Sequence, residues 1–180
     1  MSQMYIGSPN GIIVCVDRIE DGYLKGRMYH GYHEDGKSFE SLDQLVFLMG
    51  RLYDWLKYPH PAQNQRSFQS DDTAGRNRRR KKQMAEAAED LNRTYRKQEE
   101  RKRIMTDKEM LEKHGDVGTF IVRVQQRQNS TWQGRITWTE KDKTINFRSI
   151  WEMIHLMESA MVNEEKMENP DKLRNWEEEA

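Results

Sequence analysis

Two parts of the chain alternate apolar and polar residues with the period of a β-strand, and they lie 108 positions apart. Residues 12–19 and 120–127 are the first alternating stretches, and residues 23–32 and 131–139 follow them. Alternation over this length is typical of strands with one buried face. We therefore predict a β-hairpin in each half of the chain.

The turn between the strands is predicted to contain three residues, Glu20-Asp21-Gly22 in the first half and Gln128-Asn129-Ser130 in the second. Asp-Gly favours a turn because Gly adopts a positive φ without strain. A two-residue loop in the second hairpin would mix Val122 with Arg135 on one face, and a slip of one residue reverses every side chain. A further turn, Glu34-Asp35-Gly36 or Lys141-Asp142-Lys143, should lead into a short third strand.

Each third strand should be followed by a helix. Ser41-Leu-Asp-Gln44 and Ser149-Ile-Trp-Glu152 both match a capping box, in which Ser and Gln or Glu satisfy the first backbone N–H groups. Pro59 and Pro61 should stop the first helix. Apolar residues then recur at helical spacing: Leu42, Leu45, Val46, Met49, Leu52 and Tyr53; Ile150, Met153, Ile154, Met157 and Met161.

The two halves align without a gap at a shift of 108, which suggests an internal repeat. Gly26 and Gly134 match in mid-strand, where a missing side chain would let the helix pack closely. A unit of this size is small for independent folding. We therefore predict an α+β fold of two tandem ββ(β)α units, residues 5–58 and 117–163, that pack as a pseudo-dimer through sheet edges or helices.

A charged connector separates the units. Residues 59–77 are predicted to be a flexible linker, residues 78–114 a charged helix with a thin apolar stripe that reaches Met105, and residues 169–180 a short helix or tail. Thr106-Asp-Lys-Glu109 matches a further capping box. The stripe fits a helix docked against one unit, a short coiled coil or a partner-binding helix.

Composition narrows the functional classes. The 180 residues include 30 basic and 30 acidic ones, so net charge makes no case for nucleic-acid or membrane binding, although local clusters still could. Cys15 is the single cysteine, which excludes an intramolecular disulfide, and it lies in an apolar run typical of a core. The sequence shows no signal peptide and no membrane span, so we expect a soluble cytoplasmic protein.

Catalytic and metal-binding patterns are not found in the sequence. His30 and His33 are three apart on an extended segment and should point to opposite faces, which makes them a poor metal pair. No phosphate loop, dinucleotide turn or nucleophile elbow is present. We therefore expect no enzyme activity, no cofactor and no metal site.

Binding is the remaining class, and a protein partner or self-association is the first expectation. Nucleic acid is the alternative, because basic residues cluster in the connector and recur on the polar side of the second hairpin, where Gln and Asn could read base edges. The candidate nucleic-acid-binding residues are Arg76, Arg78, Arg79, Arg80, Lys81, Lys82, Arg123, Arg127 and Arg135.

The second unit also carries a resemblance. Its segment TFIVRVQQRQNSTWQG, followed by Trp138 and by NFRS at residues 146–149, resembles a family of short uncharacterised bacterial proteins, mainly from anaerobic Gram-positives. The resemblance covers residues 117–162 and leaves out the connector and most of the first unit. It implies a bacterial origin and a single module that would pair with a second copy. It implies no activity.

Overall fold

The computed structural model describes residues 6, 8–61, 102–127 and 131–161. The first half of the fold contains strands β1 (Ile12–Glu20), β2 (Tyr23–His30) and β3 (His33–Phe39) and helix α1 (Leu42–Leu56). Helix α3 (Asp107–Leu111) precedes the second half. That half contains β4 (Gly118–Gln126), β5 (Gln133–Trp138), the short 3-10 helix η1 (Thr139–Lys141), β6 (Lys143–Phe147) and α4 (Ile150–Met161).

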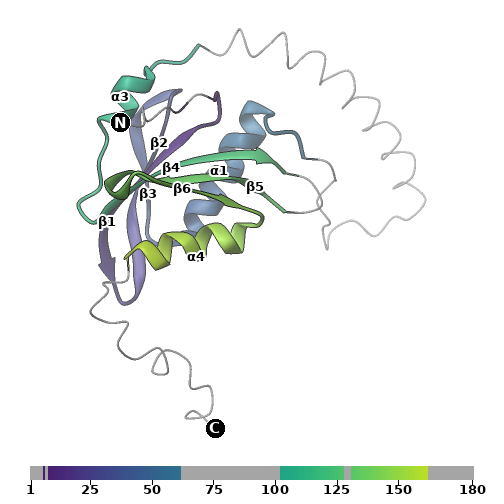
Figure 1. Cartoon of the computed structure of the whole chain (residues 1–180). Coiled ribbons are helices and arrows are strands. Elements are labelled where there is room, and N and C mark those ends of the chain that lie inside the picture. Colours follow the sequence, from purple (N-terminus) through teal and green to yellow (C-terminus); the bar gives the residue numbers. More distant parts are fainter. Residues whose placement is uncertain (1–5, 7, 62–101, 128–130, 162–180) are drawn as a thin grey trace.

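The six strands form one antiparallel sheet in the order β3-β2-β1-β4-β5-β6. β1 pairs with β4 at its centre, with Ile12 opposite Val122 and Val16 opposite Gly118. Helices α1 and α4 cover one side of this sheet, and α3 lies on the other side (Figure 1). The fold is therefore α+β, as predicted, and the two halves meet through sheet edges.

The first hairpin differs from its prediction in the length of the turn. Glu20 pairs with Tyr23, so the loop contains only Asp21 and Gly22, with φ of 51° and 78°. The predicted three-residue turn is wrong at this point, because a register shift between Val16 and Arg18 places the extra residue inside the strand. The extra residue of this bulge gives the rest of the hairpin the same register that a three-residue loop would have given.

The second hairpin has the predicted register and a bulge at the matching place. Phe120 pairs with Trp138 and Val122 with Ile136, so these apolar residues share the helix side. The register then shifts between Val124 and Gln126. The predicted turn at residues 128–130 lies outside the described residues.

Gly26 and Gly134 lie opposite these bulges. A Cβ on Gly26 would overlap the carbonyl oxygen of Cys15, and a Cβ on Gly134 would overlap that of Arg123. The expected reason for these glycines, close packing of a helix, is therefore incomplete. The backbone of the paired strand comes too close for a side chain at both positions.

The two edge strands differ. The predicted turn at residues 34–36 is wrong: the chain reverses at residues 31–32, and residues 34–36 fall inside β3. Residues 34–36 of β3 lie opposite the single residue Tyr29 of β2, and this shifts the register between Met28 and His30. β6 pairs with β5 without interruption, from Lys143 opposite Trp138 to Phe147 opposite Gly134.

Both predicted helices form, and their apolar stripes face the sheet. The capping boxes are partial: Gln44 accepts from the backbone N–H of Glu40, and Ser149 accepts from that of Glu152. α1 ends at Leu56, before the prolines, with Lys57 in the left-handed region at φ 54°. One core joins both halves and includes Ile12, Val14, Val16, Met28, Phe39, Leu45, Met49, Tyr53, Phe120, Val122, Val124, Ile136, Phe147, Met153 and Met157.

On the opposite side of the sheet, the described residues form a second apolar cluster at the centre. The apolar residues there (the seam cluster) are Ile6, Ile13, Cys15, Tyr29, Met105, Met110 and Ile121. Met110 comes from α3, whose predicted capping box forms between Thr106 and Glu109. Burial raises the pKa of the Cys15 thiol to about 12, which fits the predicted core role.

The connector agrees with its prediction only in part. Residues 102–106 are not helical, and α3 is the one helix among the described residues of the connector. The linker, the remainder of the predicted connector helix and the C-terminal segment 169–180 lie outside the described residues. Among the described helices none is long and apolar enough to cross a membrane.

Candidate functional site

Polar side chains cover the side of β4, β5 and β6 that faces away from α4. We call this surface the arginine face and define it as Arg123, Gln126, Gln133, Arg135, Thr144 and Asn146. Its residues alternate along each strand with core residues, because successive side chains of a strand point to opposite sides. Gln126, Arg135, Thr144 and Asn146 are exposed, and Arg123 and Gln133 are half-buried.

The centre of this face is a row across three strands. Arg123 is the Cα partner of Arg135 on β5, and Arg135 is the partner of Asn146 on β6. Directly opposed side chains on antiparallel strands have Cβ atoms about 5 Å apart. The row therefore places the Cβ atoms of two arginines and one asparagine side by side across three strands.

The matching row in the first half has a different chemistry. It contains Cys15, Arg27 and Ser38 in the same pairing. Asp17 holds Arg27 with two hydrogen bonds of 2.7 Å, and Arg27 donates a third, of 2.8 Å, to the hydroxyl of Tyr29. The hydrogen bonds to Asp17 raise the pKa of Arg27 above its usual value.

Arg135 has no such neutralising group. Gln125 occupies the position that matches Asp17, and it is exposed and uncharged. Within the part of the chain that the structure describes, Arg135 forms no ion pair or hydrogen bond through its side chain. Arg135 is therefore open to an external anion, whereas Arg27 is already paired.

Arg127 is not part of this surface, contrary to the prediction. The bulge before Gln126 turns it to the helix side, where its side chain is only 5% exposed. Its Nε donates to the carbonyl oxygen of Pro59 and its Nη1 to Asp54, both at 2.7 Å. Its guanidinium also lies 5.7 Å from the centre of the Tyr53 ring. These contacts therefore connect the second hairpin to the end of α1.

The remaining predicted site residues divide into two groups. The structure brings Arg123 and Arg135 together as expected. Arg76, Arg78, Arg79, Arg80, Lys81 and Lys82 lie outside the described residues. Sequence reasoning missed Thr144 and Asn146, although the alternation of "KTINF" assigns them to the same side as Arg135.

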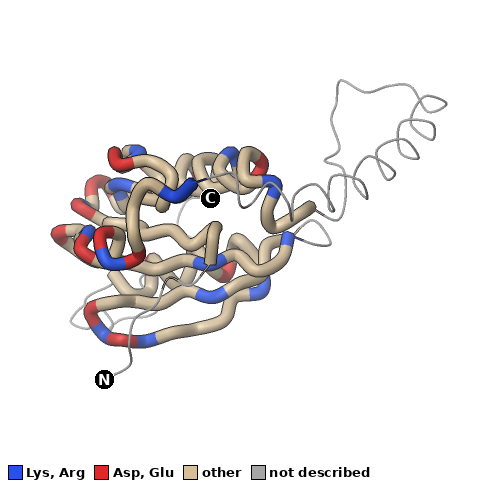
Figure 2. Tube along the Cα trace, turned by 90° about the horizontal axis from the view of Figure 1, so that it is seen from above, with Lys and Arg blue, Asp and Glu red and all other residues tan. Residues whose placement is uncertain are grey.

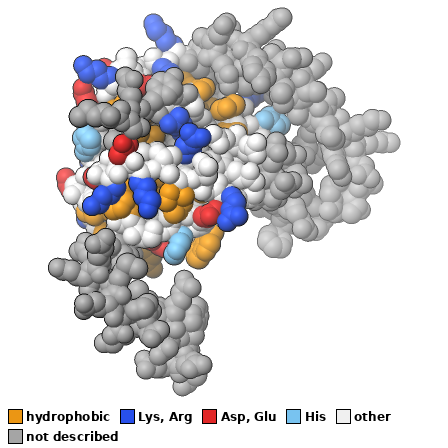
Figure 3. Space-filling view, viewed as in Figure 1, with side chains coloured by type: hydrophobic (Ala, Val, Ile, Leu, Met, Phe, Trp, Pro, Cys, Tyr) orange, Lys and Arg blue, Asp and Glu red, His pale blue; other side chains and the backbone are white. Residues whose placement is uncertain are grey.

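The wider charge distribution is mixed. Acidic positions gather mainly on one side of the described chain, and basic positions occur on both sides (Figure 2). On the face shown in Figure 3, lysine and arginine side chains are spread among hydrophobic and uncharged ones. On the face that Figure 3 shows, the described residues therefore form no broad basic patch.

The described residues offer no cluster of side chains that could bind a metal ion. No group of three or more His, Cys, Asp or Glu side chains is placed there to hold a metal ion. His30 and His33 are Cα partners across a tight turn, and each accepts a backbone N–H through Nδ1. Burial lowers the pKa of His30 to about 4.

Comparisons with protein-family models, with curated proteins and with solved structures give no match. A function is therefore inferred from the geometry of the arginine face.

Proposed function

We propose that the chain is a non-enzymatic interaction or regulatory protein that binds an anionic partner on the arginine face. The observation that carries the proposal is the direct cross-strand pairing of Arg123 with Arg135. Arg135 is exposed and forms no ion pair or side-chain hydrogen bond with the described residues, so it is the group of this pair that can receive an anion. A guanidinium group also binds a carboxylate or a phosphate through two parallel hydrogen bonds.

The partner that fits best is a protein surface or segment rich in Asp and Glu. Two arginines make a small footprint, and the chain as a whole carries no net positive charge. The exposed aromatic residues Phe47, Trp55 and Trp151 lie on the outer faces of the helices, on the other side of the sheet, and take no part in this surface.

Nucleic acid is the second candidate, favoured by the amide groups beside the arginines. Gln133 and Asn146 can donate to and accept from base edges, while Arg135 binds phosphate. The tryptophans of the second hairpin do not assist by stacking on bases, because Trp132 and Trp138 pack against the core on the helix side. A nucleic acid would therefore be held by its backbone more than by its bases.

Fluorescence anisotropy with three labelled probes tests the proposal: an oligoglutamate peptide, random single-stranded RNA and random single-stranded DNA. We expect saturable binding of the peptide that weakens as salt is raised and is lost in Arg135→Glu. Arg51→Glu, the same charge change on the exposed side of α1, should retain it. Tighter binding of RNA or DNA with a steep salt dependence would support the second candidate. No binding of any probe at low salt would refute both.

We also propose that the two halves are copies of one bacterial, cytoplasmic module that pair as an intramolecular pseudo-dimer. The supports are the matched bulges, the glycines opposite them and the central pairing of β1 with β4. A fragment of residues 117–162, which has the proposed family resemblance, should then have twice its own mass in light scattering. A folded monomeric fragment would contradict this origin.

A further inference from the structure

A pocket opens between the second half of the sheet and α4, on the side opposite the arginine face. It has a volume of about 160 Å³. Phe120, Ile136 and Trp138 form its floor, and Leu156 and Ala160 come from the helix. Lys143 and Ile145 of β6 complete its outer side, and both are exposed. Six of the eight lining residues are thus apolar, and two of these are aromatic.

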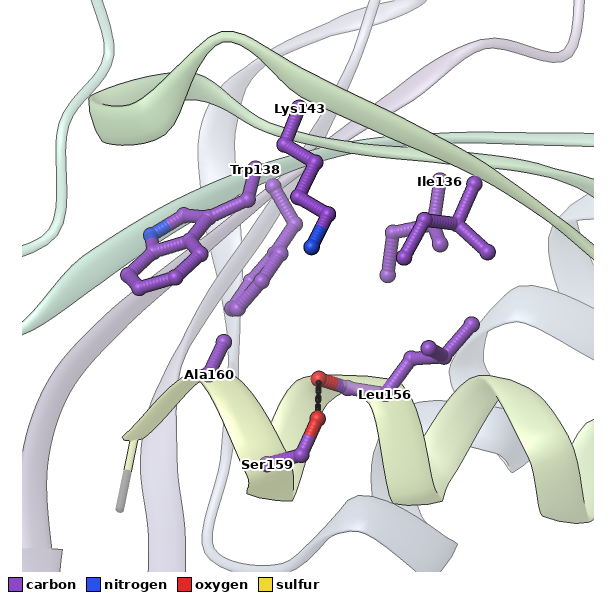
Figure 4. Close-up of a pocket in the computed structure, with 8 residues that line it drawn as sticks. Ile136, Trp138, Lys143, Leu156, Ser159 and Ala160 are labelled. Carbon is purple, nitrogen blue, oxygen red and sulfur yellow. Dashed lines mark hydrogen bonds between the residues drawn. The ribbon is translucent and has the colours of Figure 1, made fainter. Parts of the chain in front are cut away.

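One cation reaches into this apolar space. Figure 4 shows the side chain of Lys143 extending from β6 with its Nζ directed between the sheet and α4. Among the described residues no side chain forms an ion pair or a hydrogen bond with Lys143. The other polar side chain of the lining, Ser159, donates its hydroxyl to the carbonyl oxygen of Leu156 at 2.9 Å (Figure 4). Lys143 is therefore the group that can select a ligand by charge.

The matching position in the first half carries a larger side chain. The residue that matches Ala160 is Leu52, which is buried in the core. The position that matches Ser159 is Arg51. Replacing a leucine by an alanine removes three side-chain carbons, and a packed core does not fully collapse into the gap. Ala160 therefore leaves room beside α4 where the first half holds a leucine side chain.

We propose that this pocket binds a small arylalkanoate, a molecule with one aromatic ring and a carboxylate on a short chain. The ring fits the volume, because an apolar cavity of about 150 Å³ accommodates one benzene molecule. Phe120 and Trp138, whose ring centres are 6.5 Å apart, offer aromatic contacts to it. The carboxylate then meets Nζ of Lys143 at the mouth, where both charges keep part of their hydration.

This site is separate from the one proposed for an anionic partner. Lys143 and Ile145 point to the helix side of β6, whereas Thr144 and Asn146 point to the arginine face. The ligand class also differs, since the arginine face offers no apolar walls. Failure of one site therefore leaves the other untouched.

The test uses the whole chain labelled with ¹⁵N and two probes, 3-phenylpropionate and its neutral amide. We expect saturable shifts in the NMR spectrum that are confined to β5, β6, α4 and the part of β4 around Phe120. The acid should bind about two- to fivefold more tightly than the amide, the difference expected of a partly solvated ion pair. Lys143→Met should make the two affinities equal. Lys108→Met on α3, across the sheet, should leave them unchanged.

Ala160→Leu should abolish binding of both probes by filling the pocket as Leu52 fills its counterpart. Ala160→Val provides a smaller change if the leucine disturbs folding, and it should weaken both probes. Absence of saturable binding in the unaltered chain would overturn the proposal. So would equal binding of acid and amide, or full binding by a folded Ala160→Leu protein.

Discussion

Arg127 shows how one residue of the second half stabilises the first. Its buried guanidinium donates hydrogen bonds to Pro59 and Asp54 at the end of α1 and lies against the ring of Tyr53. These three contacts join the second hairpin to the helix. Asp54 is 62% exposed, and solvent therefore screens the charge attraction. The buried hydrogen bond to the carbonyl of Pro59 contributes more.

Arg127→Met should lower the free energy of unfolding by about 1–3 kcal/mol, the range for a buried hydrogen bond to a charged group. Urea unfolding followed by circular dichroism measures this change. Arg135→Met serves as the control because Arg135 is exposed, and it should change stability by less than about 0.5 kcal/mol. Equal effects of the two variants would show that Arg127 contributes no more than a surface residue.

His30 links stability to pH. Burial lowers its pKa to about 4, while the unfolded chain keeps a value near 6.5. Between these values the unfolded state binds the proton and the folded state does not, so stability should fall as the pH drops from about 6.5 to 4. Protonation would also remove the Nδ1 acceptor that Tyr32 N–H uses.

The comparison is with His30→Asn, which keeps an acceptor for Tyr32 but does not titrate. Its stability should decline less than that of the unaltered chain over the same window, as measured by urea unfolding at several pH values. The acidic residues titrate in both proteins and cancel in the difference. Parallel pH curves for the two proteins would refute the link.

At the scale of elements, the glycines opposite the bulges define the hairpins. A Cβ at Gly26 or Gly134 would overlap a backbone carbonyl, which cannot move without opening the ladder. Gly26→Ala and Gly134→Ala should each destabilise the fold by more than about 2 kcal/mol. Gly50→Ala on α1 is the control: its Cβ would make ordinary contact with Trp132, and it should stabilise by up to about 1 kcal/mol. Thermal unfolding of the three variants gives the ranking, and a mild effect at Gly26 would show that the strands can separate to admit a side chain.

The sequence predicted these elements better than their details. Alternation and helical spacing found four strands within a few residues, and both long helices, because each has one buried face. β6 was found from the turn before it and its end at Phe147. The bulge residues Asp17 and Gln125 were missed, because no particular residue type in the sequence indicates an extra residue inside a strand. That omission explains both errors nearby: the turn at Asp21-Gly22 was predicted too long, and Arg127 was assigned to the wrong side. The sequence placed Arg123 and Arg135 on one face, but the space beside Ala160 could not be recognised before the helix and the strands were placed together.

At the scale of the molecule, the two halves should unfold together. The central pairing of β1 with β4 and the common core leave no boundary at which one half could open alone. Circular dichroism follows the secondary structure of both halves. Tryptophan fluorescence follows mainly the second half, because three of the five tryptophans, Trp132, Trp138 and Trp151, lie there. The two signals should give coincident single transitions in urea. Separate midpoints would mean that the halves are independent units.

The difference between the edge strands limits how copies of this chain can associate. β3 is interrupted by inserted residues that include Glu34 and Asp35, and such an edge is a poor template for another strand. β6 is regular, so it is the edge to which a second chain could add. If β6 of one chain pairs with β6 of a second copy, the regular edges of both chains are used, and a closed twofold dimer results. Light scattering at rising concentration should therefore find masses up to two chains and no filaments.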